Sequence, residues 1–401
     1  MCYLCSLAKG LCFAFRQMIF KTKNMDNFIV SARKYRPSTF NSVVGQESIT
    51  STLKNAIKTK QVAQAFLFCG PRGVGKTTCA RIFAKALNCE HLTEDNEPCN
   101  VCESCQSFNN SASFNVFELD AASNNSVDDI RALKEQVLIP PQGAKYKVYI
   151  IDEVHMLSGA AFNAFLKTLE EPPAYAKFIM ATTEKHKILP TILSRCQVYD
   201  FKRIHDSDIV KHLQYVAQQE GVSAEEEALR VVAAKADGAL RDALSIFDQL
   251  VSFTGKNITY KATIENLNVL DIENYFNATN YVFSDDATPA LLLLNDILNK
   301  GFDAQNFIAG MASHFRNLLM AQNQQTVALL ESSEPIREKL ARQSAAIDKS
   351  LLVRALELAN QCDFNYKLSN NKRLSVELCL MQINANYVYK KNNVRQSQER
   401  K

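Results

Sequence analysis

AFLFCGPRGVGKTTCARIFAKAL, residues 65–87, joins an apolar run to an amphipathic helical pattern through a glycine-rich loop. Such glycines allow a tight loop whose backbone N–H groups point at an anion, and the positive dipole end of the following helix faces the same anion. Lys76 would then reach the terminal phosphates of ATP, and Thr77 would ligate magnesium. A chance glycine turn is the alternative, but the flanking strand and helix favour a nucleotide site. The residues assigned to it are Gly70, Gly73, Val74, Gly75, Lys76, Thr77 and Thr78.

Short apolar runs alternate with helical patterns from residue 28 to about residue 201. This alternation predicts an α/β fold in which helices cover both faces of a parallel sheet. Beyond residue 202 the strand pattern stops and helical periodicity dominates. The expected strands are residues 65–69, 116–119, 148–151, 178–181 and 198–201.

The chain divides into domains where these patterns change. Met25 opens a more ordinary start than Met1, and polar residues interrupt the helical periodicity near 260–271. We therefore expect, in order, a non-native or disordered extension at 1–24, an α/β domain at 25–203, a small helical domain at 204–268, a second helical domain at 270–388 and a basic disordered tail at 389–401.

Composition sets broad limits on the function. The chain has 401 residues, 47% of them hydrophobic, which is enough for more than one packed core. The net charge of +4 is only mildly basic, so charge alone identifies no partner. No apolar run approaches the roughly 18 residues that a membrane span needs. We therefore expect no membrane partner and a cytoplasmic location.

The segment KVYIIDEVHML, residues 147–157, ends an expected strand in two acidic residues. Asp152 and Glu153 would lie at the carboxyl edge of the sheet, where ligands bind in open parallel sheets. Asp152 would hold magnesium through water, and Glu153 would polarise the attacking water. A helix cap is the alternative for such a pair, but the upstream phosphate loop favours catalysis. We expect His155 to pack or hydrogen-bond locally.

Four cysteines cluster in NCEHLTEDNEPCNVCESC, residues 88–105. Four thiolates in a compact polar insertion can close a tetrahedral zinc shell and fold a loop that has little core of its own. Disulfides are the alternative, although this clustering is more typical of a metal site in a reducing compartment. His91 is a possible substitute ligand. The predicted structural zinc module spans 88–106, with ligands Cys89, Cys99, Cys102 and Cys105.

The segments that follow Glu153 are, in order, SGAAFNAFLKTLEEPP, FIMATTE, ILPTILSRC and GALRDALSIFDQ. This series resembles the AAA+ ATPases and, among them, the clamp loaders. The resemblance implies that Thr183, chosen over Thr182, senses the γ-phosphate. It implies that Arg195 projects into the ATP site of a neighbouring subunit, where a guanidinium can meet two phosphate oxygens at once. An ordinary surface arginine is the alternative for Arg195.

Two further segments resemble nucleotide-contacting motifs of the same superfamily. Arg241, in GALRDAL, resembles the sensor that contacts the nucleotide in cis, and an ion pair with a neighbouring aspartate is compatible with that role. The segment ARKYRPSTFNSVVGQE, residues 32–47, resembles the motif beside the adenine, although its chemistry alone indicates only a basic loop. The resemblance implies that the base is bordered by Arg36, Pro37 and Val44.

A cysteine module between the phosphate-loop helix and the next strand resembles one family closely, the gamma/tau subunits of bacterial DNA polymerase III. The match continues through ELDAASNNSVDDIR, residues 118–131, where Ser126 replaces the family's usual glycine. It is strong over 28–249 and weaker from 270 onward. It implies that 204–268 is a lid domain and 270–388 an oligomerising collar.

The resemblance implies an ATPase subunit of the replicative clamp loader. ATP binding across a ring of subunits would open the sliding clamp and grip primer-template DNA, and hydrolysis would release the clamp closed around the duplex. The chain would work within the polymerase holoenzyme at the nucleoid without any polymerase active site of its own. Polymerase core or helicase would be partners only of a longer tau-like form, whereas this length resembles the shorter gamma-like form.

Two other functions remain open on the sequence. DEVH also resembles a helicase acidic box, so a branch-migration helicase is one alternative, opposed by the cysteine module and by the triplet at 194–196. A non-hydrolysing clamp-loader scaffold is the other. It is opposed by the intact residues Lys76, Thr77, Asp152 and Glu153.

Overall fold

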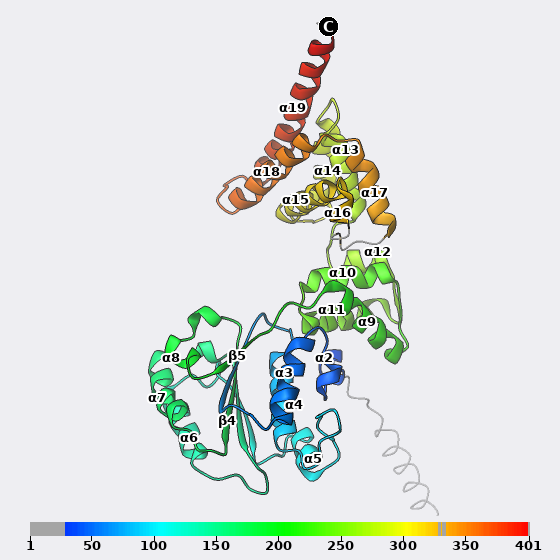
Figure 1. Cartoon of the computed structure of the whole chain (residues 1–401). Helices are drawn as coiled ribbons and strands as arrows, with labels where there is room; N and C mark the ends of the chain where they lie inside the picture. Colours follow the sequence, from blue (N-terminus) through cyan, green and yellow to red (C-terminus); the bar gives the residue numbers. More distant parts are fainter. Residues whose placement is uncertain (1–28, 328–329, 331–333, 400–401) are drawn as a thin grey trace, which may run out of the picture.

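The computed structural model describes residues 29–327, 330 and 334–399, so the predicted extension at 1–24 lies outside the described residues. Figure 1 shows an α/β lobe, a middle group of helices and a helical bundle following one another along the molecule. Within the described ranges, no helix combines the length and apolar character that a membrane crossing requires.

A five-stranded parallel sheet forms the centre of the α/β lobe, with strand order β2-β3-β4-β1-β5. All five strands predicted from apolar runs are confirmed. Their bounds are β1 Ala65–Cys69, β2 Val116–Asp120, β3 Lys147–Asp152, β4 Ala176–Thr182 and β5 Gln197–Asp200.

Helices cover both faces of this sheet (Figure 1). Alternate side chains of β1 enter different cores because successive residues of a strand point to opposite faces. Phe66 and Phe68 pack with α3 (Glu47–Lys58) and α4 (Lys76–Leu87), while Leu67 packs on the other side. The helices of that second side are α6 Val127–Val137, α7 Gly159–Glu170 and α8 Pro190–Leu193. The predicted two-sided α/β architecture is confirmed.

Short elements connect these layers at the carboxyl edge of the sheet. The 3-10 turn η1 (Phe40–Ser42) precedes α3, η2 (Val154–Met156) follows β3, and η3 (Lys185–Lys187) follows β4. Ser126 caps α6: its φ is −81°, and its hydroxyl accepts a hydrogen bond from the Asp129 N–H at 3.2 Å. A serine therefore serves here without the positive φ that would demand glycine.

The middle helices form a separate core with a small parallel ribbon. The predicted periodicity is confirmed, since Leu229, Val232, Phe247 and Leu250 are all buried. The short helix α2 (Ser31–Lys34) docks on this group through Asp248, which accepts a hydrogen bond from the Ser31 N–H at 2.7 Å. The elements are α9 Asp206–Glu220, β6 Ser223–Ala224, α10 Glu226–Ala236, α11 Leu240–Thr254, β7 Asn257–Ile258 and α12 Tyr260–Asn266.

The C-terminal bundle has its own core, beginning at Phe276, whereas the core of the middle helices ends at Leu267. We keep a domain boundary near 268–270 as a proposal on this basis. The bundle helices are α13 Ile272–Val282, α14 Thr288–Asn299, α15 Ala304–Ala321, α16 Gln324–Val327, α17 Glu334–Ala345, α18 Lys349–Tyr366 and α19 Lys372–Glu399.

The predicted disordered tail at 389–401 differs from the structure, in which α19 continues to Glu399. Extending a helix that is already nucleated costs little, because each added residue gains a hydrogen bond. The Lys, Arg, Gln and Glu residues of this segment have good helix propensity, so lack of apolar periodicity did not prevent a helix.

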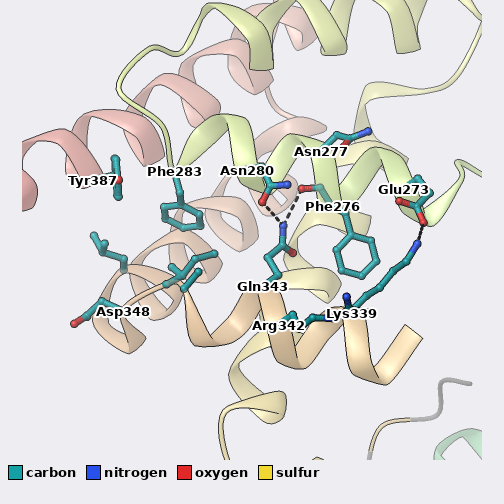
Figure 2. Close-up of a pocket in the computed structure, with 13 residues that line it drawn as sticks. Glu273, Phe276, Asn277, Asn280, Phe283, Lys339, Arg342, Gln343, Asp348 and Tyr387 are labelled. Atoms are coloured by element: carbon teal, nitrogen blue, oxygen red, sulfur yellow. Dashed lines mark hydrogen bonds and ion pairs between the residues drawn. The ribbon is translucent and has the colours of Figure 1, made fainter. Parts of the chain in front are cut away.

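A polar cavity of about 640 Å³ lies between α13, α17, α18 and α19 (Figure 2). Gln343 spans it, since its amide nitrogen donates to the Phe276 carbonyl at 2.9 Å and to the Asn280 side-chain oxygen at 2.7 Å. Lys339 pairs with Glu273 at one end of the cavity. These contacts join helices of one bundle.

Candidate active site

The phosphate-loop glycines occupy positions that a side chain could not. Gly70 has φ +146°, and a Cβ there would lie 2.4 Å from the Phe201 carbonyl oxygen. Gly73 and Gly75 have φ +77° and +102°, in the left-handed range that favours glycine. Gly75 is the residue before α4, so the loop delivers its N–H groups at the amino end of that helix.

Lys76 and Thr77 already contact the groups expected around phosphate and metal. The Lys76 ammonium is buried and donates to the carbonyls of Gly70 at 2.8 Å and Pro71 at 2.7 Å. Burial lowers the pKa of Lys76, opposed by the charges of Glu153 and Asp152. The Thr77 hydroxyl donates to Asp152 Oδ2 at 2.6 Å. The two residues assigned to magnesium therefore lie side by side.

Glu153 is held in a defined direction at the end of β3. Its φ is +48°, an unusual value for a residue with a side chain. Its Oε2 accepts hydrogen bonds from the Thr183 N–H at 3.2 Å and the Thr183 hydroxyl at 3.0 Å. The residue chosen as phosphate sensor thus contacts the residue chosen to polarise water.

His155 makes the local contacts that the sequence analysis expected. Its side chain is 5% exposed, and its Nδ1 lies 3.0 Å from the Thr182 hydroxyl. The ring also lies 3.4 Å from Glu153 Oε2 and 3.4 Å from Glu184 Oε1. The two threonines at the end of β4 therefore have different partners: Thr182 contacts His155, and Thr183 contacts Glu153.

A cavity of about 840 Å³ opens beside the loop and collects most of the predicted residues. It runs from the loop to an apolar end formed by the segment before α3 and by α11. Sequence reasoning missed several residues of its lining, although Arg72 and Val43 directly neighbour predicted ones. The predicted residues that line it are Arg36, Pro37, Val44, Gly73, Val74, Gly75, Lys76, Thr77, Thr78, Asp152, Glu153 and Arg241.

Two arginines from distant segments reach this cavity. The Arg241 N–H donates to the Gly73 carbonyl at 3.3 Å, which fixes the start of α11 against the loop. The Arg36 Nε donates to the Thr78 hydroxyl at 3.3 Å. Burial lowers the pKa of Arg36, followed by the nearby charge of Arg81. Cationic groups beside the phosphate loop suit an anionic ligand.

Arg195 is not among the residues that line the cavity. It follows α8, and its guanidinium donates to the Thr191 carbonyl at 2.6 Å and to Glu170 Oε1 at 2.9 Å. The side chain is 35% exposed. Arg195 therefore occupies a different surface from the phosphate loop of its own chain.

The four predicted zinc ligands lie together in the insertion between α4 and β2, which contains α5 (Glu103–Asn109). Their sulfurs all lie within 4.8 Å of one another, with Cys99 Sγ and Cys105 Sγ 4.0 Å apart. A tetrahedral zinc with bonds of about 2.3 Å needs sulfurs about 3.8 Å apart. Hydrogen bonding, first from the Val101 backbone, lowers the pKa of Cys99 to about 6. The donor set fits zinc.

This combination of a parallel sheet, a phosphate loop, an acidic strand end and a helical group at the cavity defines a P-loop ATPase fold of the AAA+ type. Residues 45–205 match the family model described as DNA polymerase III, delta subunit. Residues 208–256 match that of the DNA polymerase III clamp loader subunit, ATPase lid domain.

Curated relatives narrow this class. The chain is 34% identical over 359 residues to DNA polymerase III subunit gamma of Buchnera aphidicola, covering 89% of this chain and 98% of that protein. It is 41% identical over 351 residues to subunit tau of Bacillus subtilis, covering 88% of this chain but only 62% of that protein. The chain belongs to the gamma/tau subunit family of bacterial DNA polymerase III.

Among solved structures, the RuvB Holliday junction branch migration motor of Thermotoga maritima aligns with 62% of this chain and 79% of its own. The identity is 18% and the TM-score 0.44. A likeness of this size does not bear on function.

Proposed function

We propose that this chain is the ATP-hydrolysing motor subunit of a clamp loader, which uses ATP to place a sliding clamp on primed DNA. The observation that carries the proposal is the meeting of Lys76, the Thr77–Asp152 pair and Glu153 around one cavity. Membership of the gamma/tau family supports the clamp as the object of this activity.

The phosphate end of the cavity supplies charge and hydrogen-bond donors. Lys76 now donates to two loop carbonyls, and a phosphate at the loop would take over those donations. Thr77 and Asp152 would hold magnesium, which would neutralise phosphate charge when bound. Loop N–H groups at the start of α4 would complete the anion site.

Hydrolysis needs a base near the terminal phosphate. The oxygen of a water molecule attacks the γ-phosphorus, the bond to the β–γ bridging oxygen breaks, and ADP keeps the electron pair. Glu153 accepts hydrogen bonds from Thr183 on Oε2, so Oε1 is the atom we assign to the proton of the attacking water.

The adenine of ATP would lie at the apolar end of the cavity. With phosphates on the loop, the remaining lining is largely apolar on one side, where Pro37, Val43 and Val44 face Leu244 of α11. Arg36 and Arg241 lie where phosphate or ribose oxygens would pass. Contact with α11 would let the nucleotide influence how the middle helices sit on the lobe.

Arg195 would complete the ATP site of a neighbouring subunit. It is absent from the cavity of its own chain and is tethered by Glu170 on an exposed surface. A permanently charged guanidinium can stabilise charge on a transferring phosphoryl group in trans. To act there, Arg195 would have to leave its ion pair with Glu170 and contact the phosphate of the ATP bound to the neighbouring subunit.

The four-cysteine cluster would hold a structural zinc ion. A site closed by four protein sulfurs leaves no position for substrate, so the metal would stabilise the insertion without taking part in hydrolysis. We further propose that the partners are other clamp-loader subunits, the clamp and primer-template DNA, in the bacterial cytoplasm near the nucleoid. Polymerase core or helicase would be contacted only by a longer tau-like form, within the polymerase holoenzyme.

The test is ATP-dependent clamp loading on primed DNA by the assembled complex. Lys76→Ala should abolish both loading and clamp-stimulated ATP turnover, because it removes the cation at the phosphates. Lys58→Ala, which removes an exposed cation of α3 that does not line the cavity, is the control and should leave both unchanged.

Two results would contradict the proposal. Unchanged turnover in Lys76→Ala would indicate a scaffold whose ATP site is idle. Strand unwinding or branch migration without clamp loading would indicate another nucleic-acid motor. The Thr77→Ala variant provides a second check, since it removes the hydroxyl that contacts Asp152.

A further inference from the structure

Glu97 is a buried carboxylate that the ATPase chemistry does not use. It belongs to the cysteine insertion, two positions before Cys99, and is 5% exposed. Its Oε2 accepts a hydrogen bond from the Phe40 N–H at 2.7 Å, and its Oε1 accepts one from the Asn41 N–H at 2.9 Å. The Lys54 ammonium lies 2.7 Å from Oε1. A buried carboxylate thus joins the insertion to two other elements.

The insertion holds Glu97 in a fixed place. Thr93 and Glu97 close a tight turn, in which the Thr93 N–H donates to the Glu97 carbonyl at 3.0 Å and the Glu97 N–H donates to the Thr93 hydroxyl at 3.1 Å. The cysteine cluster brackets this turn, with Cys89 before it and Cys99 after it. The same insertion rests on α4, where Arg81 lies 4.9 Å from the centre of the Phe108 ring.

The backbone N–H groups that Glu97 accepts from, those of Phe40 and Asn41, belong to the segment that lines the apolar end of the ATP cavity. Phe40 is 1% exposed and anchors this segment in the core, and Val43 follows it into the cavity lining. A Cβ on Gly75 of the phosphate loop would be only 3.9 Å from Val43 Cγ1. The backbone that Glu97 holds therefore continues directly into the wall of the nucleotide site.

Side-chain contacts anchor this segment at each end and in its middle. Arg36 bonds Thr78 at the first end, and Gln46 donates to the Lys202 carbonyl at 2.7 Å at the other. Glu97 supplies the middle anchor together with Lys54, whose ammonium also donates to the Asn41 side-chain oxygen at 2.6 Å. Charge-assisted bonds from a carboxylate to two N–H groups are stronger than neutral ones, and burial protects them from screening by salt.

We propose that Glu97 is a positioning residue through which the four-cysteine module holds residues 37–44 against the nucleotide cavity. The proposal rests on the assignment of this cavity to ATP. When the module closes around metal it fixes Glu97, Glu97 fixes the turn at Phe40, and the turn fixes the apolar wall. Metal binding at the four cysteines then raises the affinity of the cavity for the adenine of ATP, and ATP binding raises the affinity for the metal in return.

The first experiment compares Glu97→Gln with Glu94→Gln in the full chain. Glutamine keeps the size of the side chain but loses the charge and one acceptor, whereas Glu94 is an exposed carboxylate of the same loop. Equilibrium binding is measured for ATP, which occupies both ends of the cavity, and for inorganic tripolyphosphate, which has no adenine and occupies only the phosphate end. Hydrogen exchange at the amides of Phe40 and Asn41 reports on the anchor itself, whether or not nucleotide binds.

We expect Glu97→Gln to raise the Kd for ATP about tenfold while the Kd for tripolyphosphate stays within about twofold of wild type. Exchange should quicken at Phe40 and Asn41, zinc content should stay at wild-type level, and Glu94→Gln should match the wild type. Unchanged exchange and unchanged ATP affinity in folded Glu97→Gln would overturn the proposal, as would an equal loss for both ligands. A purely structural role would lower the melting temperature without this difference between ligands.

Two additions keep the experiment decisive. If Glu97→Gln does not fold, Lys54→Met weakens the same anchor from the other side and should show the same pattern to a smaller degree. Failure of the wild-type chain to bind ATP would reject the proposed function, whereas normal ATP binding with unaltered exchange in both variants would reject only the role of Glu97.

Discussion

The α/β lobe and the C-terminal bundle differ in what they bury. Among the described residues, every buried Lys or Glu lies in the lobe, and the bundle buries only neutral polar side chains. Both regions expose some large apolar side chains, for example Phe114 in the lobe and Phe364 on α18 of the bundle. Buried charge in the lobe is Lys76, Lys85, Glu97, Lys147 and Lys177.

This difference indicates how each region responds to mutation. A buried charge is tolerated only where partners are held in place, so the lobe keeps groups such as Lys76 beside defined acceptors. The core of the bundle is held by apolar packing and neutral hydrogen bonds, and its ion pairs, such as Lys339–Glu273, are exposed. We therefore expect changes to the side chains of the nucleotide cavity to alter ATP chemistry, and changes in the bundle to alter stability without altering ATP affinity.

The largest expected effect is that of Arg195→Ala, which tests the lobe. In the assembled complex, ATP turnover should fall about a thousandfold, because an arginine supplied in trans stabilises transition-state charge. The ATP affinity of the isolated chain should stay within about twofold, since Arg195 does not line its own cavity. Steady-state turnover and equilibrium binding measure the two.

Lys187→Ala is the matched control, because Lys187 is a nearby exposed cation paired with Glu184. It should leave turnover unchanged. A loss of ATP affinity in the isolated Arg195→Ala chain would mean that Arg195 acts in cis. Unchanged turnover in the complex would mean that it is an ordinary surface arginine.

Prediction from the sequence was accurate where the signal is local. Each apolar run became a strand because four or five consecutive residues carry the pattern. Asp152, Glu153 and Thr183 could be expected to meet, since the ends of parallel strands share one edge of a sheet. The choice of Thr183 over Thr182 as phosphate sensor came from resemblance and stays a prediction, while the structure shows that Thr183 is the one that contacts Glu153.

Contacts between distant segments could not be read from the sequence. Glu97 lies 57 residues from Phe40, and no periodicity connects a loop carboxylate to a backbone N–H so far away. The length of α19 was missed for another reason, since its polar end has helix propensity but no apolar face. The roles of Arg195 and Arg241 depend on ligands and partners, which local patterns do not encode.

The bundle provides the next largest effect. Gly310, on α15, packs against Tyr275, and a Cβ there would lie 2.2 Å from the Tyr275 hydroxyl oxygen. Tyr275 cannot easily yield, because its ring stacks on Phe307 with centroids 6.2 Å apart. Gly310→Ala should therefore destabilise the bundle by about 1–3 kcal/mol, despite the better helix propensity of alanine. ATP affinity should not change.

Thermal unfolding and ATP binding measure these two expectations. Gly159→Ala is the control in the lobe, because a Cβ at that helical position meets no atom within 4 Å. Addition of Tyr275→Leu to Gly310→Ala should restore part of the stability. If Gly310→Ala lowered ATP affinity as well as bundle stability, the bundle and the ATP site in the lobe would not be independent.

The smallest effect is a pH dependence of the bundle that arises from one buried histidine. His314 is buried on α15, and its Nε2 lies 2.9 Å from Gln343 Oε1. Figure 2 shows Gln343 donating through its nitrogen to Phe276 and Asn280. Its oxygen therefore accepts from His314 Nε2–H, as a neutral imidazole can provide. Burial lowers the pKa of His314, and the hydrogen bond to Gln343 partly opposes the shift.

A lowered pKa in the folded chain means that the unfolded chain binds the proton first. As pH falls through the unfolded value of about 6.5, the free energy of unfolding should drop by up to about 1.4 kcal/mol per pH unit, until the folded histidine also titrates. Hydrogen exchange of the α15 core amides at pH 7.5 and pH 5.5 measures this locally. His314→Gln should remove most of the dependence in α15 while leaving that of α9, where burial also lowers the pKa of His212. Equal pH dependence of α15 exchange in wild type and variant would show that the neutral hydrogen-bond network of the bundle does not depend on the protonation of His314.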